Sequence, residues 1–465
     1  MHLRQSLMRF TEYLNNRTDT AEFMNHIYFI GIGGIGMSAI ARYYNAKGFK
    51  VSGYDKTPSP LTHALEAEGI EIHYEDNTDF IPKDVENTLV VYTPAIPADM
   101  GELVYVQQKG YRVIKRSRML GEIAEGQRCM AVAGTHGKTT TSTLTSHLFT
   151  DSGEGCSAFL GGISKNYDTN LLIHENNVIV AEADEFDRSF LQLFPEIAVI
   201  TSMDADHLDI YGDAEHVTEA FKAFASQVNG TVIAKYGLDI TASDTKAEIR
   251  TYAFGNDKAD FYAEPLEDGH FNLHYPGGVI EDCVVGIPGW VNVENATAAS
   301  AIALTYGIEP DKIRKALANF SGVKRRFDIQ VKKPGCVYID DYAHHPEEIN
   351  AALSSIRRSY PDAKLTAVFQ PHLYTRTRDF APEFAEALSL ADKVILLDIY
   401  PARELPIPGV TSEIIFKDIK SEKILLRRDE LMGYLENEPV EVLATLGAGD
   451  IDRFVGKIAK MLEKR

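Results

Sequence analysis

The sequence predicts an α/β protein of three domains, each built on a parallel sheet. Short apolar runs of β type alternate with helical patterns along most of the chain, which is typical of such sheets. Two glycine-rich turns each stand between an apolar run and the start of a helical pattern. The chain of 465 residues is also too long for one ordinary domain. We expect a Rossmann-like domain over 1–125, a central P-loop ATPase-type domain over 126–328 and a C-terminal Rossmann-like α/β domain over 329–465.

The first domain begins with an apolar, strand-like run over residues 27–30. This run leads into a glycine turn and then a helix that ends near Gly48. A second strand closes on Asp55, and a further strand-like run covers residues 88–97. These elements predict a strand–turn–helix–strand unit.

The first glycine turn has the spacing G-x-G-x-x-G, formed by Gly31, Gly33 and Gly36. Glycines let backbone N–H groups approach a diphosphate at a helix N-terminus, and an acid such as Asp55 can bind a ribose hydroxyl. The pattern usually indicates NAD, but any nucleotide diphosphate meets the same physical requirements. A tight turn without a ligand is the alternative, so the turn by itself does not identify the ligand.

The second glycine turn has the context of a P-loop, between a strand over 129–133 and a helix that begins at Lys138. Loop amides would hold the β- and γ-phosphates, Lys138 would neutralise their charge, and Thr139 can reach Mg²⁺. The general P-loop has a glycine where this chain has Val132, so the loop is a shortened variant. The residues predicted to bind nucleotide here are Gly134, Thr135, His136, Gly137, Lys138, Thr139 and Thr140.

Acids follow the next predicted strand, over residues 178–182, which ends at Glu182. A carboxylate at the carboxyl end of a strand lies near the ligand crevice of an open α/β sheet, where it can bind the same Mg²⁺ as Thr139. Asp184 and Glu185 are close by, and the residues alone do not choose among the three. His207 follows another strand, predicted over 197–202, and imidazole also suits a divalent cation.

The third domain is predicted from strands over 336–341, 365–370, 393–398 and 441–450. Polar residues follow the first two of these strands, which places them at one edge of the sheet. The arginine among them can form a bidentate pair with a substrate carboxylate. These candidate residues are Asp341, Tyr342, His344, His372 and Arg376.

Three other segments have less specific interpretations. The two histidines before Pro346 can also mark a helix start. Arg325 and Arg326, at the junction of the second and third domains, can hold phosphates or belong to a linker. Residues 240–286 have the pattern of strands and turns without recognisable chemistry, and the charged run over 421–430 is expected to be a solvated surface.

The composition limits the classes of partner and the compartment. A formal net charge of −20 argues against a nucleic acid or an acidic membrane as partner. The four cysteines are scattered without metal-ligand spacing, which is typical of reduced thiols. The N-terminal stretch is polar and amphipathic, and no apolar run approaches the roughly 18–20 residues that span a bilayer. We therefore expect a cytoplasmic protein without membrane insertion.

Taken together, these segments resemble the Mur ligases, the ATP-dependent amide-forming enzymes of peptidoglycan precursor synthesis. The resemblance runs from about residue 26 to about residue 450, in the order of the family. It is carried by HIYFIGIGGIGMSAIA, AGTHGKTTT, AEADEFD, ADHLD, PGWVNVENATAA, RRFD, DDYAHHP, QPHLYTRT, YPARELPIPGV and GAGDI. Within the family the chain looks most similar to the branch that joins L-alanine to the lactyl carboxylate of UDP-N-acetylmuramate through an acyl phosphate.

The resemblance implies a role for each group of candidate residues. It implies ATP and Mg²⁺ as cofactors, with Thr139, Glu182 and His207 as metal ligands and with Asn292 and Asn295 at the adenine. It implies that Lys138, His207, Arg326 and Asp341 take part in catalysis, the last two also contacting the nucleotide. The residues expected around the sugar nucleotide, the amino acid and the muramyl carboxylate are Gly33, Gly34, Gly36, Asp55, Thr93, Tyr342, His344, His372 and Arg376.

The chain departs from the family pattern at two positions, and a third position matches only some sister ligases. Val291 stands where the family commonly has a histidine, which affects one adenine contact. Leu373 stands where some members have an arginine, which would thin the carboxylate clamp. Lys222 lies where several sister ligases have a carbamylated lysine that bridges metals, although the alanine-adding branch does not generally need it. A surface lysine on a helix is the alternative at that position.

Three alternative functions remain to be separated from the alanine-adding one. A recycling ligase of the same family would attach a whole peptide to UDP-N-acetylmuramate. A nicotinamide-dependent oxidoreductase would account for the first glycine turn and leave the P-loop unexplained. A nucleotide-binding regulatory protein would use the same loops without catalysis. The chain is expected to act as a monomer or a homodimer.

Overall fold

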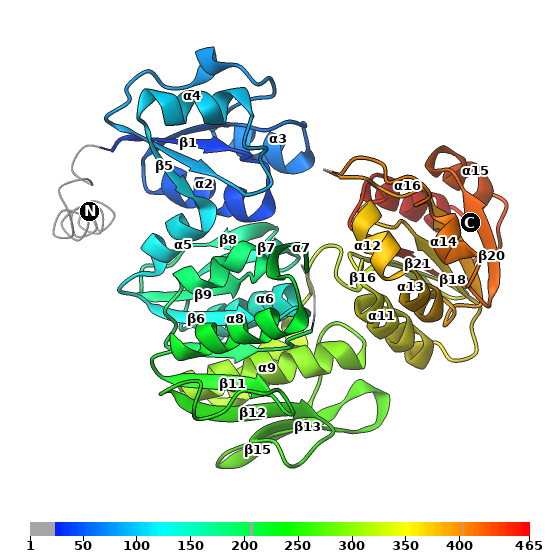
Figure 1. The fold of residues 1–465 in the computed structure, drawn as a ribbon. Coiled ribbons are helices and arrows are strands. Elements are labelled where there is room, and N and C mark those ends of the chain that lie inside the picture. The colour runs from blue at the N-terminus through cyan, green and yellow to red at the C-terminus, as the bar shows by residue number, and fades with distance from the viewer. Residues whose placement is uncertain (1–23, 205–207, 403) are drawn as a thin grey trace. The chain divides into compact units, whose positions relative to one another are not determined.

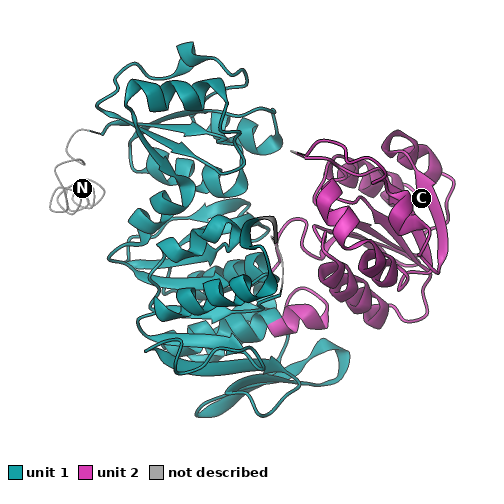
Figure 2. Cartoon of the chain, viewed as in Figure 1, with its two compact units in different colours: residues 1–284, 295–320 teal, residues 285–294, 321–465 magenta. Residues whose placement is uncertain are grey.

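The computed structural model describes residues 24–204, 208–402 and 404–465. These residues form three sheets, each accompanied by helices (Figure 1). They divide into two compact units, shown in different colours in Figure 2. Unit 1 comprises the described residues up to 284 together with 295–320, and unit 2 comprises 285–294 and the described residues from 321 onward. The predicted α/β fold class is confirmed.

The first sheet of unit 1 has the strand order β3-β2-β1-β4-β5, and all its neighbouring strands are parallel. Its strands are β1 (His26–Ile30), β2 (Lys50–Tyr54), β3 (Glu71–His73), β4 (Thr88–Tyr92) and β5 (Arg112–Lys115). The helical segments between and after them are α2 (Ile35–Ala46), α3 (Pro60–Ala67), η1 (Thr78–Phe80), α4 (Gly101–Lys109) and α5 (Arg116–Ala124).

The central strand β1 shows why the sequence favours this sheet. Four of its five residues are buried, as expected for a parallel strand covered by helices on both faces. The predicted strand over 88–97 is shorter in the structure, because β4 ends at Tyr92. Pro94 and Pro97 follow, and proline has no backbone N–H to donate to a sheet.

The second sheet of unit 1 has the order β15-β14-β13-β12-β11-β10-β6-β9-β7-β8. It is parallel from β13 to β7, with antiparallel strands added at both edges. The strands are β6 (Arg128–Ala133), β7 (Ser157–Ser164), β8 (Thr169–Leu172), β9 (Val178–Ala183), β10 (Ile197–Ile200), β11 (Thr231–Lys235), β12 (Glu248–Phe254), β13 (Phe261–Pro265), β14 (Phe271–Tyr275) and β15 (Gly278–Cys283). The helical segments are α6 (Lys138–Asp151), η2 (Phe186–Gln192), α7 (Leu208–Tyr211), α8 (Ala214–Ser226), η3 (Glu267–Gly269), α9 (Trp290–Tyr306) and α10 (Pro310–Asn319). The first residues of α9, up to Glu294, belong to unit 2.

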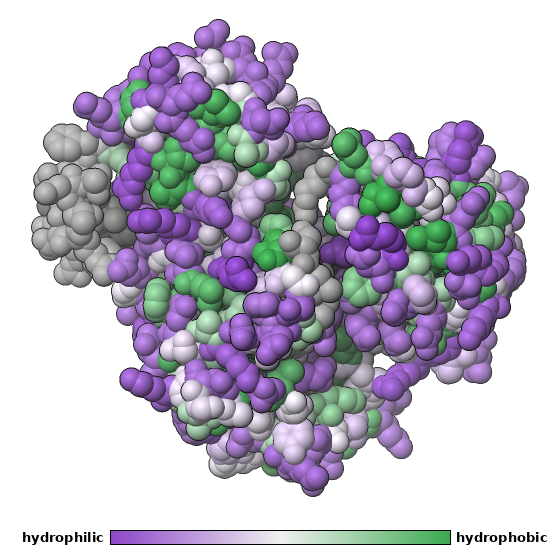
Figure 3. Space-filling view, viewed as in Figure 1, coloured by the Kyte–Doolittle hydropathy of each residue, from purple (hydrophilic) through white to green (hydrophobic). Residues whose placement is uncertain are grey.

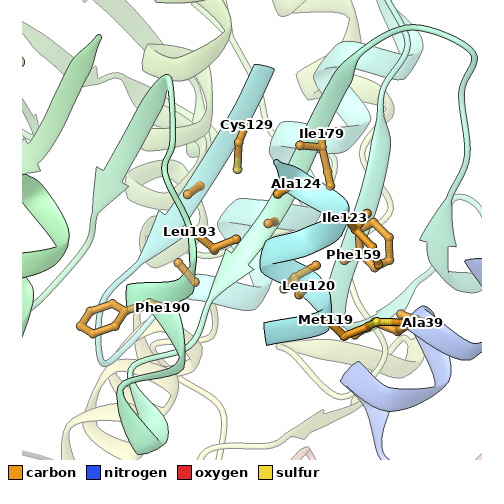
Figure 4. Packing of buried hydrophobic residues seen from close by; sticks show 14 of the residues in the cluster. Ala39, Met119, Leu120, Ile123, Ala124, Cys129, Phe159, Ile179, Phe190 and Leu193 are labelled. Carbon is orange, nitrogen blue, oxygen red and sulfur yellow. The ribbon is translucent and has the colours of Figure 1, made fainter. Parts of the chain in front are cut away.

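One hydrophobic cluster joins the two sheets of unit 1. It runs from the buried side chains of β1 and α2 through α5 to β6, β9 and η2. Figure 4 shows the part of this cluster in which α5 contributes Leu120 and Ile123, near Phe159 of β7, and Met119, beside Ala39 of α2. The two sheets therefore share a continuous apolar core.

Unit 2 contains the third sheet, in the order β16-β17-β21-β18-β19-β20. All neighbours are parallel except β16, which forms an antiparallel pair with β17. The strands are β16 (Asp328–Lys333), β17 (Cys336–Asp341), β18 (Leu365–Phe369), β19 (Lys393–Leu397), β20 (Glu422–Leu426) and β21 (Val442–Leu446). The helical segments are α11 (Pro346–Ser359), α12 (Tyr374–Asp379), α13 (Ala381–Leu388), α14 (Glu413–Phe416), η4 (Arg428–Glu430), α15 (Leu431–Leu435) and α16 (Asp452–Glu463).

The charged run over 421–430 contains the edge strand β20, whose last four residues are half-buried. Glu422 and residues 427–430 are exposed, in agreement with the predicted solvated surface. Charged residues at both ends are compatible with an edge strand, because they discourage pairing with another chain. Within the described residues, no helix is both long and apolar enough to cross a membrane. Hydrophilic residues cover most of the face shown in Figure 3, with apolar residues in small groups.

Candidate active site

The first glycine turn lies at the carboxyl end of β1, beside the ends of β2 and β4. Gly33 N donates to Oδ2 of Asp55 at 2.8 Å, and a Cβ on Gly33 would lie 2.7 Å from that oxygen. A Cβ on Gly31 would lie 3.0 Å from Cγ2 of Thr93. Gly34 is the N-cap residue of α2. The structure thus brings the predicted sugar-nucleotide residues of this unit to one edge of the first sheet.

Asp55 has a more specific position than the sequence indicated. Its Oδ2 accepts from Gly33 N and its Oδ1 from Thr57 N at 3.1 Å, so the carboxylate caps the glycine turn. The backbone N of Asp55 in turn donates to the carbonyl oxygen of His73 at 3.1 Å. A ligand that uses the Gly33 N–H must compete with Asp55 for it.

The second glycine turn joins β6 to α6 in four residues. Gly134 has φ 131°, and a Cβ there would overlap Oγ1 of Thr201 and lie 2.8 Å from Ser202 N. Gly137 has φ 80°, and a Cβ there would lie 2.8 Å from Oδ1 of Asn295. Both positions therefore require glycine for backbone conformation and for space. The same contacts bring the predicted adenine residue Asn295, on α9, to the N-terminus of α6.

The segment after β10 holds the middle of this loop. Ser202 Oγ lies 2.8 Å from Oγ1 of Thr135 and accepts from His136 N at 2.9 Å. His136 Nε2 lies 3.5 Å from Oδ2 of Asp204. These bonds fix the loop in one shape, as a preformed phosphate cradle requires.

The helix α6 is unusually rich in threonine and serine, yet it is almost completely buried. Its hydroxyls donate to backbone carbonyl oxygens one turn earlier, as Thr143 Oγ1 does to Thr139 O at 2.7 Å and Thr145 Oγ1 to Thr141 O at 2.8 Å. Such bonds satisfy buried hydroxyls inside a helix. Thr140, also predicted at the nucleotide, is buried in the first turn of this helix.

Lys138, the first residue of α6, is directed back over the loop. Its Nζ donates to the carbonyl oxygens of Gly134 at 2.6 Å and Thr135 at 3.3 Å, and to Oε1 of Glu185 at 2.9 Å. Burial lowers the pKa of Lys138, but the carboxylates of Glu185, Asp184 and Glu182 outweigh it and the net pKa is raised. The lysine is therefore a firmly charged group at the loop.

The structure distinguishes the three acids that the sequence left equivalent. Glu182 accepts from Thr139 Oγ1 at 3.2 Å and Ser142 Oγ at 3.4 Å, at the start of α6. Asp184 instead pairs with Arg116, at 3.1 Å, and Glu185 with Lys138. Glu182 is therefore the carboxylate that shares a position with the P-loop threonine. A sequence pattern of three closely spaced acids could not have shown this division.

The Thr139–Glu182 pair fits a divalent cation. A hydroxyl and a carboxylate oxygen, 3.2 Å apart, are hard oxygen ligands of the kind Mg²⁺ prefers. The third predicted ligand, His207, lies outside the described residues. Among the residues that are described, no group of three or more histidine, cysteine, aspartate or glutamate side chains forms a metal cluster.

Unit 2 carries the second group of candidate residues, beginning at the end of β17. Asp341 accepts from Phe327 N at 2.6 Å and Ala343 N at 2.7 Å. Burial raises the pKa of Asp341 to about 6, although the Arg326 charge and these two bonds lower it. The Arg326 guanidinium lies 4.9 Å from the ring centre of Tyr342, a cation–π distance. Arg326, Asp341 and Tyr342 therefore form one local group.

His344 and His372 extend this group. The His344 ring lies 5.2 Å from that of Tyr342 and 6.0 Å from that of His372. Burial lowers the pKa of His344 to about 4, opposed by Glu348 and assisted by the positive charge of Arg376. His344 is therefore neutral near pH 7. Arg376, in α12, acts electrostatically on His344, so the structure brings these predicted residues of unit 2 together.

Other predicted positions in unit 2 are placed as follows. His345 is the N-cap of α11 and Pro346 its first residue, so the two histidines mark a helix start as well as a site. Leu373 is buried with φ 72° immediately before α12. Asn292 is buried on α9, where its Nδ2 donates to Pro288 O at 2.6 Å. Val291 lies beside it in the sequence, in the first turn of α9.

Arg325 has a role that the sequence did not reveal. Its Nε donates to the buried Asp340 at 3.3 Å, and its Nη2 donates to Gly447 O at 2.7 Å. It therefore holds the ends of β17 and β21 together. Lys222 lies on α8 and pairs with Asp239 at 2.6 Å, mainly through a hydrogen bond that raises its pKa. In the structure Lys222 is a charged lysine in an ion pair.

Comparison with known proteins gives matches along nearly the whole chain. A sequence model described as "Mur ligase family, catalytic domain" matches residues 26–128. One described as "Mur ligase middle domain" matches residues 132–303, and one described as "Mur ligase, glutamate ligase domain" matches residues 325–449.

Relatives of known name and solved structures agree with these matches. A UDP-N-acetylmuramate–L-alanine ligase of Porphyromonas gingivalis is 50% identical over 95% of this chain and 99% of its own length. Its counterpart from Phocaeicola vulgatus is 48% identical over the same shares. The crystal structure of a UDP-N-acetylmuramate-alanine ligase from Thermotoga maritima matches with a TM-score of 0.81 at 27% identity, over 94% of this chain and 99% of that one. A murein peptide ligase of Psychrobacter arcticus has a TM-score of 0.71 at 21% identity, over 95% and 99%, which shows a shared fold.

Proposed function

Because the chain belongs to the Mur ligase family, we propose that it joins L-alanine to the lactyl carboxylate of UDP-N-acetylmuramate, converting ATP to ADP and phosphate. The relatives that carry this activity in their names cover almost the whole chain at about half identity. The reaction supplies a precursor of peptidoglycan. We assign the sugar nucleotide to residues up to 125, ATP to 126–328 and the amino acid to 329–465.

The observation that carries the proposal is the construction of the second glycine turn. A loop held by Ser202 places Lys138 and Thr139 at the N-terminus of α6, with Glu182 beside the threonine hydroxyl. Backbone amides, a buried ammonium and a hydroxyl–carboxylate pair are the groups that phosphoryl transfer from ATP requires. A nicotinamide-dependent oxidoreductase would have no use for this set.

The reaction proceeds in two steps. The lactyl carboxylate attacks the γ-phosphorus, the bond to the ADP oxygen breaks, and an acyl phosphate forms. The amine of alanine then attacks the acyl carbon and loses a proton, and phosphate leaves. Lys138 stabilises the negative charge on the transferring phosphoryl group, which is the main contribution a protein makes to this chemistry. The family resemblance implies a catalytic role for Arg326 as well.

The metal site follows from the fit of Thr139 and Glu182. These two residues would hold Mg²⁺, with His207 as the further ligand that the family resemblance implies. Bound there, the cation would neutralise charge on the ATP phosphates. Asn295, next to Gly137, and Asn292, on the same helix, would contact the adenine.

The first glycine turn would hold the diphosphate of the sugar nucleotide at the N-terminus of α2, where backbone N–H groups and the helix dipole favour an anion. Asp55 and Thr93 line the same edge. In unit 2 the neutral His344, with His372 and Arg376, would receive the amino acid. A neutral imidazole can accept a hydrogen bond from an ammonium group, and Arg376 can bind a carboxylate.

The test is phosphate release from ATP and Mg²⁺ in the presence of UDP-N-acetylmuramate and one acceptor at a time: L-alanine, glycine, L-serine or a tripeptide. We expect release that requires both the sugar nucleotide and L-alanine, with the amide product identified by its mass. Release with the tripeptide alone would assign the chain to the peptide-recycling ligases. No release with any pair would refute the ligase proposal.

A further inference from the structure

Arg116, the first residue of α5, occupies the space above the glycine turn. A Cβ on Gly36 would overlap Nη1 of Arg116 and lie 3.3 Å from its Cζ. Gly36 is in the first turn of α2, whose N-cap is Gly34. The third glycine of the G-x-G-x-x-G pattern is therefore required to admit a guanidinium at the end of the helix where the diphosphate is proposed to bind.

The same arginine also binds the acidic segment that follows β9. Its Nη2 donates to Oδ2 of Asp184 at 3.1 Å, and the two side chains are 20% and 33% exposed. The neighbouring Lys115 forms a parallel ion pair with Asp187 at 2.7 Å. Two basic residues at the start of α5 thus hold the segment between β9 and η2.

This acidic segment has little freedom to move. Asp187 and Arg188 both adopt φ 53°, a conformation that non-glycine residues rarely occupy. Asp184 accepts from Phe186 N through its Oδ1 at 3.1 Å and from Phe190 N through its carbonyl oxygen at 2.9 Å. A shift of the Asp184 side chain must therefore be transmitted to the residues beside it.

Glu185, the next residue, is 2% exposed and holds the P-loop lysine. Its two carboxylate oxygens lie 2.9 and 2.8 Å from Lys138 Nζ. Its carbonyl oxygen accepts from Tyr211 Oη at 2.6 Å. An ammonium has three donors, and Lys138 directs them at Gly134, Thr135 and Glu185. To bind a phosphate, the lysine must release one of these partners, and the position of Glu185 determines how readily it does so.

The apolar contacts beneath these ion pairs make the connection rigid. A Cβ on Gly121 of α5 would lie 2.5 Å from Gln192 O, so α5 and η2 are in close backbone contact. Phe190 and Leu193 belong to the same core cluster as the side chains of α5, as labelled in Figure 4. On the other side of α2, the buried Asn170 donates to Ile35 O at 2.6 Å and ties that helix to β8.

We propose that Arg116 is a positioning residue that couples the diphosphate site at the first glycine turn to the P-loop lysine, through Asp184 and Glu185. This inference rests on the proposed function, because it takes the two ligands from it. A diphosphate at Gly36 gives Arg116 a second anionic partner and immobilises it on Asp184. Through the linked backbone of this segment, the change at Asp184 reaches Glu185, whose position determines how readily Lys138 exchanges a partner for a phosphate of ATP.

The coupling is measured by calorimetry on the full chain. The affinity for a non-hydrolysable ATP analogue with Mg²⁺ is determined with and without saturating UDP-N-acetylmuramate. We expect the sugar nucleotide to tighten analogue binding at least about fivefold, the lower end of ordinary allosteric coupling. We call the analogue affinity with the sugar nucleotide, divided by the affinity without it, the coupling ratio. In Arg116→Gln and in Asp184→Asn this ratio should fall to about one, while the affinity for the analogue alone changes little.

Lys115→Gln is the matched control. It removes the neighbouring ion pair, between Lys115 and Asp187, and leaves the pair between Arg116 and Asp184 in place. Its coupling ratio should equal that of the wild type. A merely structural role of Arg116 would lower stability without changing this ratio.

Two results would overturn the inference: a wild-type ratio of one, or a wild-type ratio that persists in both Arg116→Gln and Asp184→Asn. If Arg116→Gln does not fold, Asp184→Asn decides, because it breaks the same pair from the other side. Failure of the proposed function is a separate result. It would appear as absence of amide formation by the wild type, with or without coupled binding.

Discussion

Lys138 and Glu185 form a buried ion pair at the centre of the P-loop, with Nζ 2.9 Å from Oε1 and 2.8 Å from Oε2. The lysine that the sequence predicts at the phosphates thus has a carboxylate partner that the sequence did not predict. The pair keeps the ammonium charged in a buried position, where an unpaired charge would be costly. Phosphate binding therefore requires Lys138 to give up one of its present partners.

Lys138→Ala should abolish turnover and leave the sugar nucleotide bound. Loss of the ammonium removes charge stabilisation from the transferring phosphoryl group, so phosphate release should fall by at least about 100-fold. Binding of UDP-N-acetylmuramate, measured by calorimetry, should stay near the wild-type value. Loss of that binding would contradict the assignment of the two ligands to different loops.

Glu182→Gln should weaken Mg²⁺ binding. An amide has the shape of the carboxylate but not its charge, so the Mg²⁺ concentration for half-maximal turnover should rise about 10-fold or more. Glu196→Gln is a suitable control, because Glu196 pairs with Arg128 at a half-exposed position of the same unit. An unchanged Mg²⁺ requirement in Glu182→Gln would remove this residue from the metal site.

Gly36→Ala should destabilise unit 1 by displacing Arg116. Forcing a methyl group into an occupied space commonly costs about 1–3 kcal/mol of the free energy of unfolding. Gly34→Ala is the control from the same turn, because a Cβ on Gly34 would lie 3.5 Å from the nearest atom, which is an ordinary contact. The double variant Gly36→Ala with Arg116→Ala should recover much of the loss in thermal unfolding. Equal losses in the single and double variants would show that the clash is not with the arginine.

Glu102→Gln should change how stability depends on pH. Glu102 is fully buried on α4, accepting from Tyr28 Oη at 2.6 Å and Asn77 N at 3.0 Å. Burial raises its pKa from 4.5 to about 7, with a smaller contribution in the same direction from Asp76, although both hydrogen bonds lower it. The folded state therefore binds this proton more tightly than the unfolded state. The resulting stability is fully present below about pH 4.5 and is lost as pH rises to about 7.

The glutamine variant cannot lose that proton, so its stability relative to the wild type should increase between pH 5 and pH 7. Each unit of pKa shift corresponds to about 1.4 kcal/mol, and denaturant unfolding at the two pH values measures the difference. The nearby His73 has a lowered pKa, mainly because of burial, but it is common to both proteins. A constant difference across the range would mean that Glu102 is ionised throughout.

Lys222→Ala should retain turnover, since Lys222 is a charged lysine paired with Asp239. Carbamylation needs a neutral amine, and the raised pKa of this lysine opposes it. Mass spectrometry of the intact protein should show no added carboxyl group. A large loss of activity that bicarbonate restores would show a metal-bridging carbamate instead.

Local sequence patterns predicted the strands and glycine turns well, because each depends on neighbouring residues. The strand over 336–341 matches β17 residue for residue, and α6 begins at Lys138 as expected. The strand predicted to Ser202 ends at Ile200, since Thr201 and Ser202 turn to bind the P-loop. That contact joins residues far apart in the chain, which no local pattern reports.

The polar contacts within the site could not be predicted for the same reason, because they join residues far apart in the chain. The sequence placed Glu182, Asp184 and Glu185 near a crevice but could not divide them among Thr139, Arg116 and Lys138, because the division depends on which elements pack together. Arg116 itself has no motif. The only indication of Arg116 in the sequence is the third glycine of the first turn. This glycine predicts a close approach by the ligand, and in the structure it also leaves room for the arginine.

The apolar cluster that runs through α5 has a consequence for dissecting the protein. Leu120 and Ile123 lie in one apolar cluster with side chains of the second sheet such as Phe159. A fragment ending at residue 125 would present this surface to water and should aggregate, whereas a fragment extended through residue 320 would keep it covered. The two sheets of unit 1 should unfold together in a single thermal transition, because they share this core. Proteases should likewise cut between them only after both have unfolded.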